Sequence, residues 1–509
     1  MRRRRRHTAS MPDAPAPAQA QGQAPAATDR PHFVGIAGSG MSGLARLARA
    51  RGAAVTGSER DDGPAAAALR AEGFPVCLGQ RADTLPADAT RVTASAAVPA
   101  DHPELVEARR RGLPILKYAE ALGELMGLPG TEGVAVSGTH GKSSTTAMLA
   151  HVLLACGRDP SFILGARCEQ IGGGSRCAAA AAGGAGLGVL VAEACEFDRS
   201  FHHLAPRHAI VLNVEADHLD CYGSLDEIVK SFGVFVGRLP AGGSLLIQHE
   251  AAARIAVSAA AGPGVGVETL GFSPDADWRV GVDPAGPDAA AGGPSGDAGV
   301  TLSRRGEEVA AWTLALPGQH MAYNAAAAAV TAHRLGVPLG EAAAALSGFR
   351  GLDRRMQRRG RFAVPGAAGG AAAVIDDYAH HPTEIDATLR ALRGHHRPAR
   401  LFCVFQPHQH SRTRHLLAEF ATAFEPADRV LVPDIYFVRD SEAEREAVTS
   451  GDLVRLLRAG GVDAEHVAGF DEAAATLRAE LRDGDLVVTM GAGDVWKVAE
   501  ALTRPPAAA

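Results

Sequence analysis

Aromatic residues make up only 5% of this chain, and its seven cysteines are scattered, with no C-x-x-C pair among them. An odd, unpaired set of cysteines argues against a disulfide framework or a structural zinc site and indicates a reducing compartment. No run of 18 or more apolar residues is present, so no membrane span is predicted. The net charge of −6 is small and gives no support for a nucleic-acid or membrane surface. We therefore expect a cytoplasmic protein with no nucleic-acid partner.

The N-terminal segment is basic but has no apolar core. Five arginines at positions 2–6 precede a run rich in Pro, Ala and Gln that extends to about Asp29. A secretory signal needs an apolar stretch of about 7–15 residues after its charges, and none follows here. We expect residues 1–30 to form a disordered tail.

The strongest local signal is the segment Gly138–Ser144, which reads GTHGKSS. It lies between an apolar stretch, Gly133–Val136, and a helical pattern over Thr145–Leu154. A strand, a Gly-rich turn and a helix N-terminus together point backbone N–H groups at phosphate. Lys142 is placed to reach the β- and γ-phosphates and Ser143 to ligate Mg²⁺. The strict P-loop pattern has Gly where Val136 stands, so an incidental Gly-rich turn is the alternative.

Two further regions carry α/β patterns. The first joins a strand over His32–Ile36 to a G-x-G-x-x-G turn at Gly38–Gly43 and a second strand over Ala53–Gly57. This pattern predicts a Rossmann-like site for a nucleotide diphosphate, or simply a tight strand–helix turn. The last region alternates helical patterns, among them Arg414–Phe424, with strands expected at Ala373–Ile375, Leu401–Phe405, Val430–Val432 and Leu486–Met490.

Clusters of Gly and Pro near positions 127–130 and a Gly at 351 suggest domain boundaries. We predict an α/β protein of three domains: a Rossmann-like domain over 31–128, a central P-loop ATP-binding domain with a mostly parallel sheet over 129–351, and a C-terminal Rossmann-like domain over 352–509. Two Gly- and Ala-rich stretches, 177–186 and 262–299, are predicted to be loop insertions.

Polar side chains follow several of the expected strands. Glu193 follows the apolar run Leu187–Val191, and His218 comes soon after Ala209–Leu212. Because parallel strands end at one edge of a sheet, these side chains are expected to face Ser143. A hydroxyl and a carboxylate suit Mg²⁺, whereas an imidazole is a less usual ligand for it. The alternatives are a structural or hydrogen-bonding role for His218 and a helix-capping or salt-bridging role for Glu193.

In the last region, Asp376–Pro382 and Gln406–Arg414 each follow an expected strand and are rich in His, Arg and Tyr. Such side chains suit a carboxylate or phosphate ligand, with polar surface loops as the alternative.

In combination these motifs resemble the Mur ligases of peptidoglycan synthesis. The resemblance covers about Pro31 to Leu502. Its motifs are Gly35–Gly43, Gly138–Ser144, Glu193–Asp198, Asn213–Tyr222, Gly318–Asn324, Asp353–Arg355, Asp376–Glu384, Phe405–Arg414 and Thr489–Lys497.

The resemblance implies an enzyme that uses ATP and Mg²⁺. In such a ligase ATP phosphorylates the carboxylate of UDP-N-acetylmuramate, and an amino acid attacks the acyl phosphate. Ala216 and Gly233 favour the branch that adds L-alanine over the murein-tripeptide recycling ligases and over later-acting relatives with a carbamylated lysine.

The resemblance also implies roles for individual residues. The catalytic set is Lys142, His218, Glu193 and Arg412, and the metal ligands are Ser143, Glu193 and His218. ATP is bound by Gly138, Thr139, His140, Gly141, Lys142, Ser143, Ser144, His320, Asn324, Arg355 and Asp377. The UDP-sugar is bound by Gly38, Ser39, Gly40, Met41, Ser42, Ser58 and Ser95. The amino acid is bound by Tyr378, His380, His381, His408 and Arg414.

The chain departs from the family at four positions. Ser143 replaces a usual Thr but retains the hydroxyl. Cys195 replaces a usual Asp near the metals, Met321 replaces a usual Asn near the adenine, and Glu59 replaces a common Asp. Folate-type polyglutamate ligases lack the N-terminal Gly-rich domain. An NAD-dependent oxidoreductase would leave the Lys142 loop unexplained, and a non-enzymatic nucleotide switch would leave the C-terminal His and Arg loops unexplained.

Overall fold

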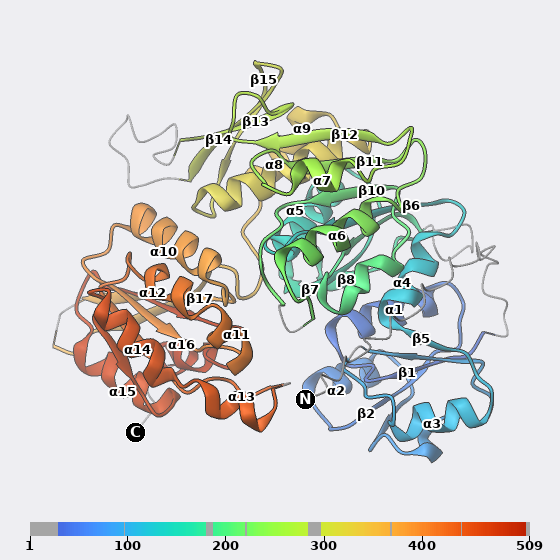
Figure 1. The fold of residues 1–509 in the computed structure, drawn as a ribbon, viewed down its shortest axis with the longest axis horizontal. Coiled ribbons are helices and arrows are strands. Elements are labelled where there is room, and N and C mark those ends of the chain that lie inside the picture. Colours follow the sequence, from blue (N-terminus) through green and yellow to red (C-terminus); the bar gives the residue numbers. More distant parts are fainter. Residues whose placement is uncertain are drawn as a thin grey trace, which may run out of the picture.

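The computed structural model describes residues 29–95, 97–179, 187–218, 221–283, 297–366, 369–438 and 440–504. The chain forms three successive α/β units, each built on its own sheet (Figure 1). The predicted tail lies almost wholly outside the described residues, as does most of the predicted loop 177–186. Within the described residues, no helix is long and apolar enough to cross a membrane. All seven cysteines are described, and each is a free thiol.

The first unit is a parallel five-stranded sheet in the order β3-β2-β1-β4-β5, the arrangement of a Rossmann-like half. Successive residues of β1 point to opposite faces of the sheet and belong to different hydrophobic clusters. Phe33 packs with Leu44 and Leu122, and Val34 packs with Leu105. The second strand begins later than predicted, because its pairing with β1 starts at Thr56. The elements are β1 Pro31–Val34, α1 Ser39–Ala50, β2 Thr56–Glu59, α2 Pro64–Ala71, β3 Val76–Leu78, β4 Arg91–Ala94, α3 Pro103–Arg110, β5 Ile115–Lys117 and α4 Tyr118–Met126.

The central unit is a ten-stranded sheet, parallel from β7 to β13 and closed by antiparallel strands at both edges. Its elements are β6 Thr131–Ser137, α5 Lys142–Ala155, β7 Ser161–Cys168, β8 Gly173–Arg176, β9 Gly188–Glu193, η4 Phe197–His203, β10 His208–Val211, α6 Leu225–Val236, β11 Ser244–Gln248, α7 Arg254–Ser258, β12 Gly266–Gly271, β13 Trp278–Asp283, β14 Ala298–Arg304, β15 Glu307–Leu314, α8 Gln319–Arg334 and α9 Leu339–Ser347.

The prediction of a loop over 262–299 is wrong for most of its described part, which contains β12, β13 and the start of β14. In β13 the apolar residues alternate, and Trp278 and Val280 point into the core. The surrounding Gly, Pro and Asp obscured this period-two pattern. Residues 284–296 lie outside the described part of the chain.

Helices α5 and α8 pack together behind the phosphate-loop segment. Helix α8 is buried on all sides here, since the consecutive residues Ala325–Ala329 are all buried. Small side chains let the two helix backbones approach closely, so the alanine content of this segment serves the packing.

The third unit is a six-stranded sheet in the order β16-β17-β21-β18-β19-β20, parallel except for β16. The helix predicted over Arg414–Phe424 is instead two helices that meet at Leu416. The elements are β16 Gln357–Ala363, β17 Ala371–Asp377, α10 Pro382–His396, β18 Leu401–Phe405, α11 His410–His415, α12 Leu417–Ala423, β19 Arg429–Val432, α13 Glu442–Ala447, α14 Ser450–Ala459, β20 Ala464–His466, α15 Phe470–Glu480, β21 Leu486–Met490 and α16 Trp496–Thr503.

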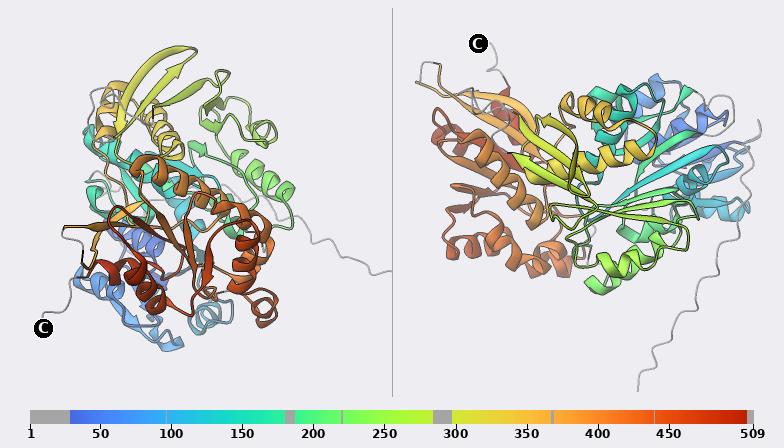
Figure 2. Two further views of the ribbon diagram at one scale, coloured as in Figure 1. Left: turned by 90° about the vertical axis from the view of Figure 1, so that its left-hand side faces the viewer. Right: turned by 90° about the horizontal axis from the view of Figure 1, so that it is seen from above.

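The central unit lies between the other two, as the view from above shows (Figure 2). On one side α1 packs on β7 and β8. On the other side the N-terminal end of α10 reaches the loops that follow β6 and β10. The strand ends of the central sheet are thereby brought into contact with the third unit.

Candidate active site

The loop between β6 and α5 is built around two glycines in left-handed conformations, Gly138 and Gly141. A Cβ on Gly141 would lie 2.6 Å from Oδ1 of Asn324, and one on Gly138 would lie 3.0 Å from Cβ of Leu212. The N–H of His140 donates to Oδ1 of Asn213, which follows β10, at 2.7 Å. The loop is therefore held tightly at the N-terminus of α5, where the helix dipole favours an anion.

The ammonium of Lys142 folds back over this loop. It donates to the carbonyl oxygens of Gly138 at 2.6 Å and Thr139 at 3.1 Å, and it pairs with the Glu196 carboxylate at 2.9 Å. Burial opposes its charge, but Glu196 outweighs burial and raises the pKa of Lys142, so the side chain is a fixed cation. Glu196 was not among the predicted site residues, although it lies in the motif Glu193–Asp198.

Ser143 and Glu193 meet where β6 and β9 end side by side. The Ser143 hydroxyl donates to Oε2 of Glu193 at 3.0 Å, and the N–H of Gly165 donates to Oε1 at 2.5 Å. His218, in the loop after β10, lies beside the partner of Lys142, with Nε2 4.0 Å from Oε1 of Glu196. Burial is the main cause that lowers the pKa of His218, which leaves the imidazole neutral and able to ligate a cation. A hydroxyl, a carboxylate and a neutral imidazole fit a divalent cation.

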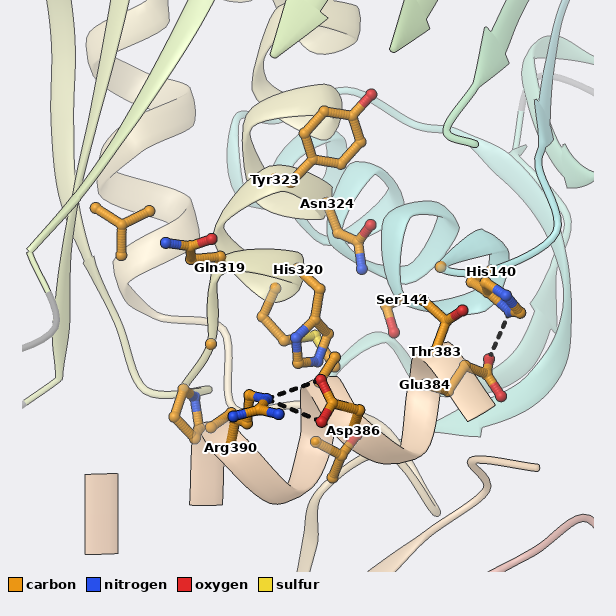
Figure 3. Close-up of a pocket in the computed structure, with 18 of the residues that line it drawn as sticks. His140, Ser144, Gln319, His320, Tyr323, Asn324, Thr383, Glu384, Asp386 and Arg390 are labelled. Carbon is orange, nitrogen blue, oxygen red and sulfur yellow. Dashed lines mark hydrogen bonds and ion pairs between the residues drawn. The ribbon is translucent and has the colours of Figure 1, made fainter. Parts of the chain in front are cut away.

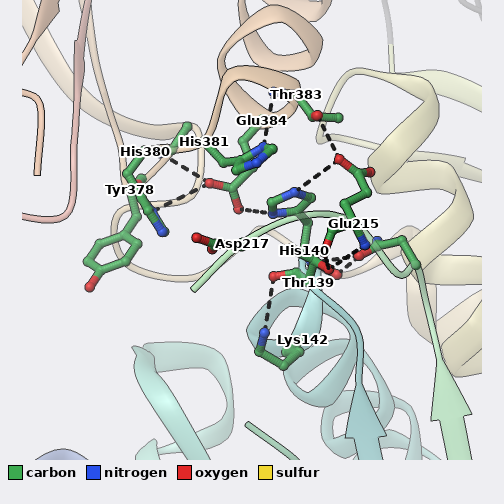
Figure 4. Close-up of polar contacts among 12 residues, drawn as sticks. Thr139, His140, Lys142, Glu215, Asp217, Tyr378, His380, His381, Thr383 and Glu384 are labelled. Carbon is green, nitrogen blue, oxygen red and sulfur yellow. Dashed lines mark hydrogen bonds and ion pairs between the residues drawn. The ribbon is translucent and has the colours of Figure 1, made fainter. Parts of the chain in front are cut away.

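A charged network joins this loop to the third unit (Figure 4). Nδ1 of His140 lies 3.2 Å from Glu384, and its Nε2 lies 3.6 Å from Glu215. Burial opposes protonation, but the two carboxylates outweigh it and raise the pKa of His140 to about 9. The Thr383 hydroxyl also donates to Glu215, at 2.7 Å. The imidazolium is thus held between an acid of the central unit and an acid of α10.

His381 completes the junction. Its Nε2 lies 3.3 Å from the Ala216 carbonyl, and its Nδ1 accepts the Thr383 N–H. Ligand atoms of His140, Glu215 and His381 lie within 4.8 Å of one another, a spacing that could hold a metal ion. Both nitrogens of His381 are already engaged, however, so the contacts observed are those of an interdomain ion-pair cluster.

Arg412, on α11 of the third unit, contacts the loop that carries Asp217 and His218 in the central unit. Its Nε lies 3.1 Å from Asp217, and its Nη2 lies 3.5 Å from Nδ1 of His218. Nη1 lies 3.5 Å from Nδ1 of His408. A cation from the third unit therefore stands beside the phosphate loop, which is the charge arrangement that phosphoryl and acyl-phosphate chemistry needs.

Comparisons with known proteins match the three units of this chain to three domains of one family. Domain profiles match residues 30–128 (Mur ligase family, catalytic domain), 136–332 (Mur ligase middle domain) and 355–493 (Mur ligase, glutamate ligase domain). The chain is 42% identical to the UDP-N-acetylmuramate–L-alanine ligase of Streptomyces avermitilis over 93% of this chain and 97% of that protein. The chain belongs to the Mur ligase family.

A second curated relative and a solved structure are also similar to this chain over most of its length. The UDP-N-acetylmuramate–L-alanine ligase of Paenarthrobacter aurescens is 42% identical over 92% of this chain and 94% of that protein. The crystal structure of UDP-N-acetylmuramate–alanine ligase from Thermotoga maritima has a TM-score of 0.73 and 26% identity, covering 93% of this chain and 98% of that one. The three-domain α/β fold predicted from the sequence is therefore confirmed.

This Mur ligase has a cavity of about 840 Å³ between the central and third domains (Figure 3). Four of the residues predicted to bind ATP line it beyond the phosphate loop: His320, Asn324, Arg355 and Asp377. Burial lowers the pKa of His320 to about 4 and raises that of Asp377 to about 6. Met321, where the family usually has Asn, also lines the cavity, together with Tyr323 and Phe272, which sequence reasoning did not select.

The residues predicted to bind the amino acid mostly gather beside Arg412. The ring of His380 lies 5.5 Å from that of Tyr378 and 6.5 Å from that of His408. His408 stacks on Tyr436 at 5.3 Å. Arg414 differs: it is exposed, and its position two residues after Arg412 on α11 directs it to the other side of the helix.

The residues predicted to bind the UDP-sugar divide into two groups. Gly38 and Ser39 are exposed at the N-terminus of α1, Gly40 and Ser42 are half-buried beside them, and Ser95 is half-buried after β4. Met41 and Ser58 are buried, and the Ser58 hydroxyl donates to Glu104 at 2.6 Å. Contacts from these last two positions to a ligand would have to come from the backbone. Glu59 accepts the N–H of Ala37 at 3.0 Å and so braces the turn.

Proposed function

We propose that this Mur ligase joins L-alanine to the carboxylate of UDP-N-acetylmuramate through an acyl phosphate, with release of ADP and phosphate. The observation that carries the proposal is the chain of contacts from Lys142 through Glu196 and His218 to Arg412 of the third domain, next to the Ser143–Glu193 pair. The relatives named UDP-N-acetylmuramate–L-alanine ligase, at about 40% identity over nearly the whole chain, support this choice of substrates.

The chemistry brings two polyanions together, so charge neutralisation is the main task of the site. The muramate carboxylate attacks the γ-phosphorus of ATP, the bond to the bridging oxygen breaks, and ADP leaves. Lys142 binds the phosphate oxygens during this transfer. The amine of L-alanine then attacks the acyl carbon, and phosphate departs from the tetrahedral intermediate. Arg412 holds the acyl phosphate while the amine approaches.

Ser143, Glu193 and His218 are the residues that would hold Mg²⁺. When bound, Mg²⁺ supplies positive charge to the phosphate oxygens. The Ser143 hydroxyl is already aligned with Glu193 at 3.0 Å, and Gly165 leaves room there, since a Cβ on it would lie 3.3 Å from the carboxylate oxygens.

We assign substrates to domains on the same grounds. The first domain, 31–128, would take the UDP-sugar at its Gly-rich turn, because Gly38 and Ser39 are exposed at the N-terminus of α1, where the helix dipole favours an anion. The central domain, 129–351, would take ATP, with His320, Asn324, Arg355 and Asp377 along the cavity. The third domain, 352–509, would take L-alanine near Tyr378, His380, His381 and His408. Dependence on ATP supports a cytoplasmic site for this step of peptidoglycan precursor synthesis.

Release of ADP tests the proposal. ADP and phosphate should form only when UDP-N-acetylmuramate and L-alanine are both present. Formation of AMP and pyrophosphate would contradict the acyl-phosphate route. Replacing L-alanine by the tripeptide L-alanyl-γ-D-glutamyl-meso-diaminopimelate separates the recycling ligases, since only a recycling enzyme would prefer it. Glycine and L-serine should be tested as alternative amino-acid substrates, because they differ from L-alanine by only a few atoms. The methyl that glycine lacks is worth only about 1–3 kcal/mol of discrimination.

A further inference from the structure

The ring of Tyr118, the first residue of α4, lies against the Gly-rich turn of the first domain. A Cβ on Gly40 would lie 2.9 Å from Cζ and 3.1 Å from the hydroxyl oxygen of Tyr118. Gly40 lies within α1, and its φ is not in the left-handed region, so its backbone does not require glycine. The absence of a side chain at position 40 is instead what lets the phenol approach the turn.

Helix α4 is fixed to the central domain. Lys117 donates to Asp198 at 2.7 Å, and a Cβ on Gly123 would lie 2.0 Å from the carbonyl oxygen of His203. The helix therefore packs directly on η4, the segment that follows the Glu193 strand end. Through these contacts the position of the Tyr118 ring is set by both domains.

The Tyr118 hydroxyl stays protonated and can therefore donate a hydrogen bond. Burial raises the pKa of Tyr118, and the nearby Glu193 and Cys195 raise it further, so the hydroxyl keeps its proton. The ring itself is only partly covered by the apolar core. A protonated phenol thus stands between the turn that faces the diphosphate and the strand end that carries Glu193.

We propose that Tyr118 binds the sugar nucleotide between its diphosphate and its reacting carboxylate, by donating a hydrogen bond from the phenol. This assignment rests on the proposed function. A nucleotide sugar held at its diphosphate by the turn must extend past Tyr118 for its carboxylate to reach Lys142 and Glu193. The phenol is rigid and anchored to both domains, so it sets how far the carboxylate extends.

Tyr118→Phe removes the hydroxyl and keeps the ring. Steady-state kinetics should show KM for UDP-N-acetylmuramate raised about tenfold, the usual effect of losing a hydrogen bond to a charged ligand. The KM values for ATP and L-alanine should stay within about twofold. Calorimetry with UDP-N-acetylmuramate alone should show the same weakening without turnover. Glu124→Gln, on the solvent side of the same helix, serves as the control and should change none of these values.

Gly40→Ala tests the geometry independently, because the added methyl must displace the ring. It should also raise KM for UDP-N-acetylmuramate. In the double variant Gly40→Ala/Tyr118→Ala, this KM should be less than twofold higher than in Tyr118→Ala alone. Unchanged binding in Tyr118→Phe, or an equal rise in all three KM values, would overturn the proposal. Absence of any UDP-N-acetylmuramate-dependent ADP release by the unmodified enzyme would instead overturn the proposed function.

Discussion

Nε of Arg412 lies 3.1 Å from Oδ1 of Asp217, across the boundary between the central and third domains. Both side chains are buried, at 8% and 5% exposure. Burial would raise the pKa of Asp217, but Arg412 outweighs it and holds that pKa well below its ordinary value. Two desolvated charges of opposite sign depend on each other, so this pair ties the third domain to the loop that follows β10 in the central domain.

Arg412→Ala should therefore weaken domain closure as well as catalysis. Small-angle scattering should show compaction of the unmodified enzyme when UDP-N-acetylmuramate, an ATP analogue and L-alanine are added, and less compaction in the variant. Turnover should fall by about 10²–10³, the usual effect of removing a charge-stabilising donor. Arg455→Ala removes an exposed charge from the same domain and should compact normally. Full compaction of Arg412→Ala would show that the pair does not hold the domains together.

Lys142→Ala should lose transition-state stabilisation of roughly 3–4 kcal/mol. It also leaves the charged Glu196 buried without its partner, at a cost of about 3–5 kcal/mol in folding stability. The double variant Lys142→Ala/Glu196→Gln should recover the melting temperature and remain inactive. Recovery of turnover along with stability would mean that Lys142 acts only as a structural partner of Glu196.

Much of the architecture could be predicted from local patterns. The strands Leu401–Phe405 and Leu486–Met490 have the bounds expected from their apolar runs. The phosphate loop was recognised because its glycines, lysine and hydroxyl are contiguous. Strand β13 was missed, because its alternation of Trp278 and Val280 is surrounded by turn-forming residues.

The interdomain contacts could not be predicted in this way. His140 and Glu384 are 244 positions apart, and Arg412 and Asp217 are 195 apart. No periodicity or spacing connects such residues, since only the packing of separate domains brings them together. Their motifs could be recognised, but the pairing of an acid in one motif with a cation in another had to come from the structure.

Glu104 should contribute stability to the first domain that is lost in acid. It is fully buried and accepts hydrogen bonds from Ser58 at 2.6 Å and Thr84 at 2.7 Å, with His32 at 3.0 Å. Burial opposes its charge, yet these partners hold its pKa below the ordinary 4.5. A lowered pKa means that the stabilisation is present above pH 4.5 and fades as pH falls below it.

Glu104→Gln should therefore reduce hydrogen-exchange protection of β1 amides at neutral pH, by about 1–3 kcal/mol. The difference from the unmodified enzyme should shrink as pH falls below 4.5. Glu124→Gln, an exposed site, should show no such difference. Equal protection in Glu104→Gln at neutral pH would contradict the role assigned to this carboxylate.

Closure of the third domain should take up a proton at His140. The imidazole has a pKa of about 9 while Glu384 and Glu215 flank it, against an ordinary value of 6.5. The stabilisation from its charge is therefore complete below pH 6.5 and is lost as pH rises through about 9. At pH 8 a closed form would hold His140 mostly charged, whereas an open form would lose Glu384 and keep only Glu215, so closing should bind less than one proton. Calorimetric titration with UDP-N-acetylmuramate, an ATP analogue and L-alanine, in buffers of different ionisation enthalpy, measures this uptake.

Glu384→Gln keeps the shape of the junction but removes the nearer carboxylate, so its proton uptake at pH 8 should be smaller. Uptake of the same size in His140→Gln would assign the proton to another group and refute the prediction.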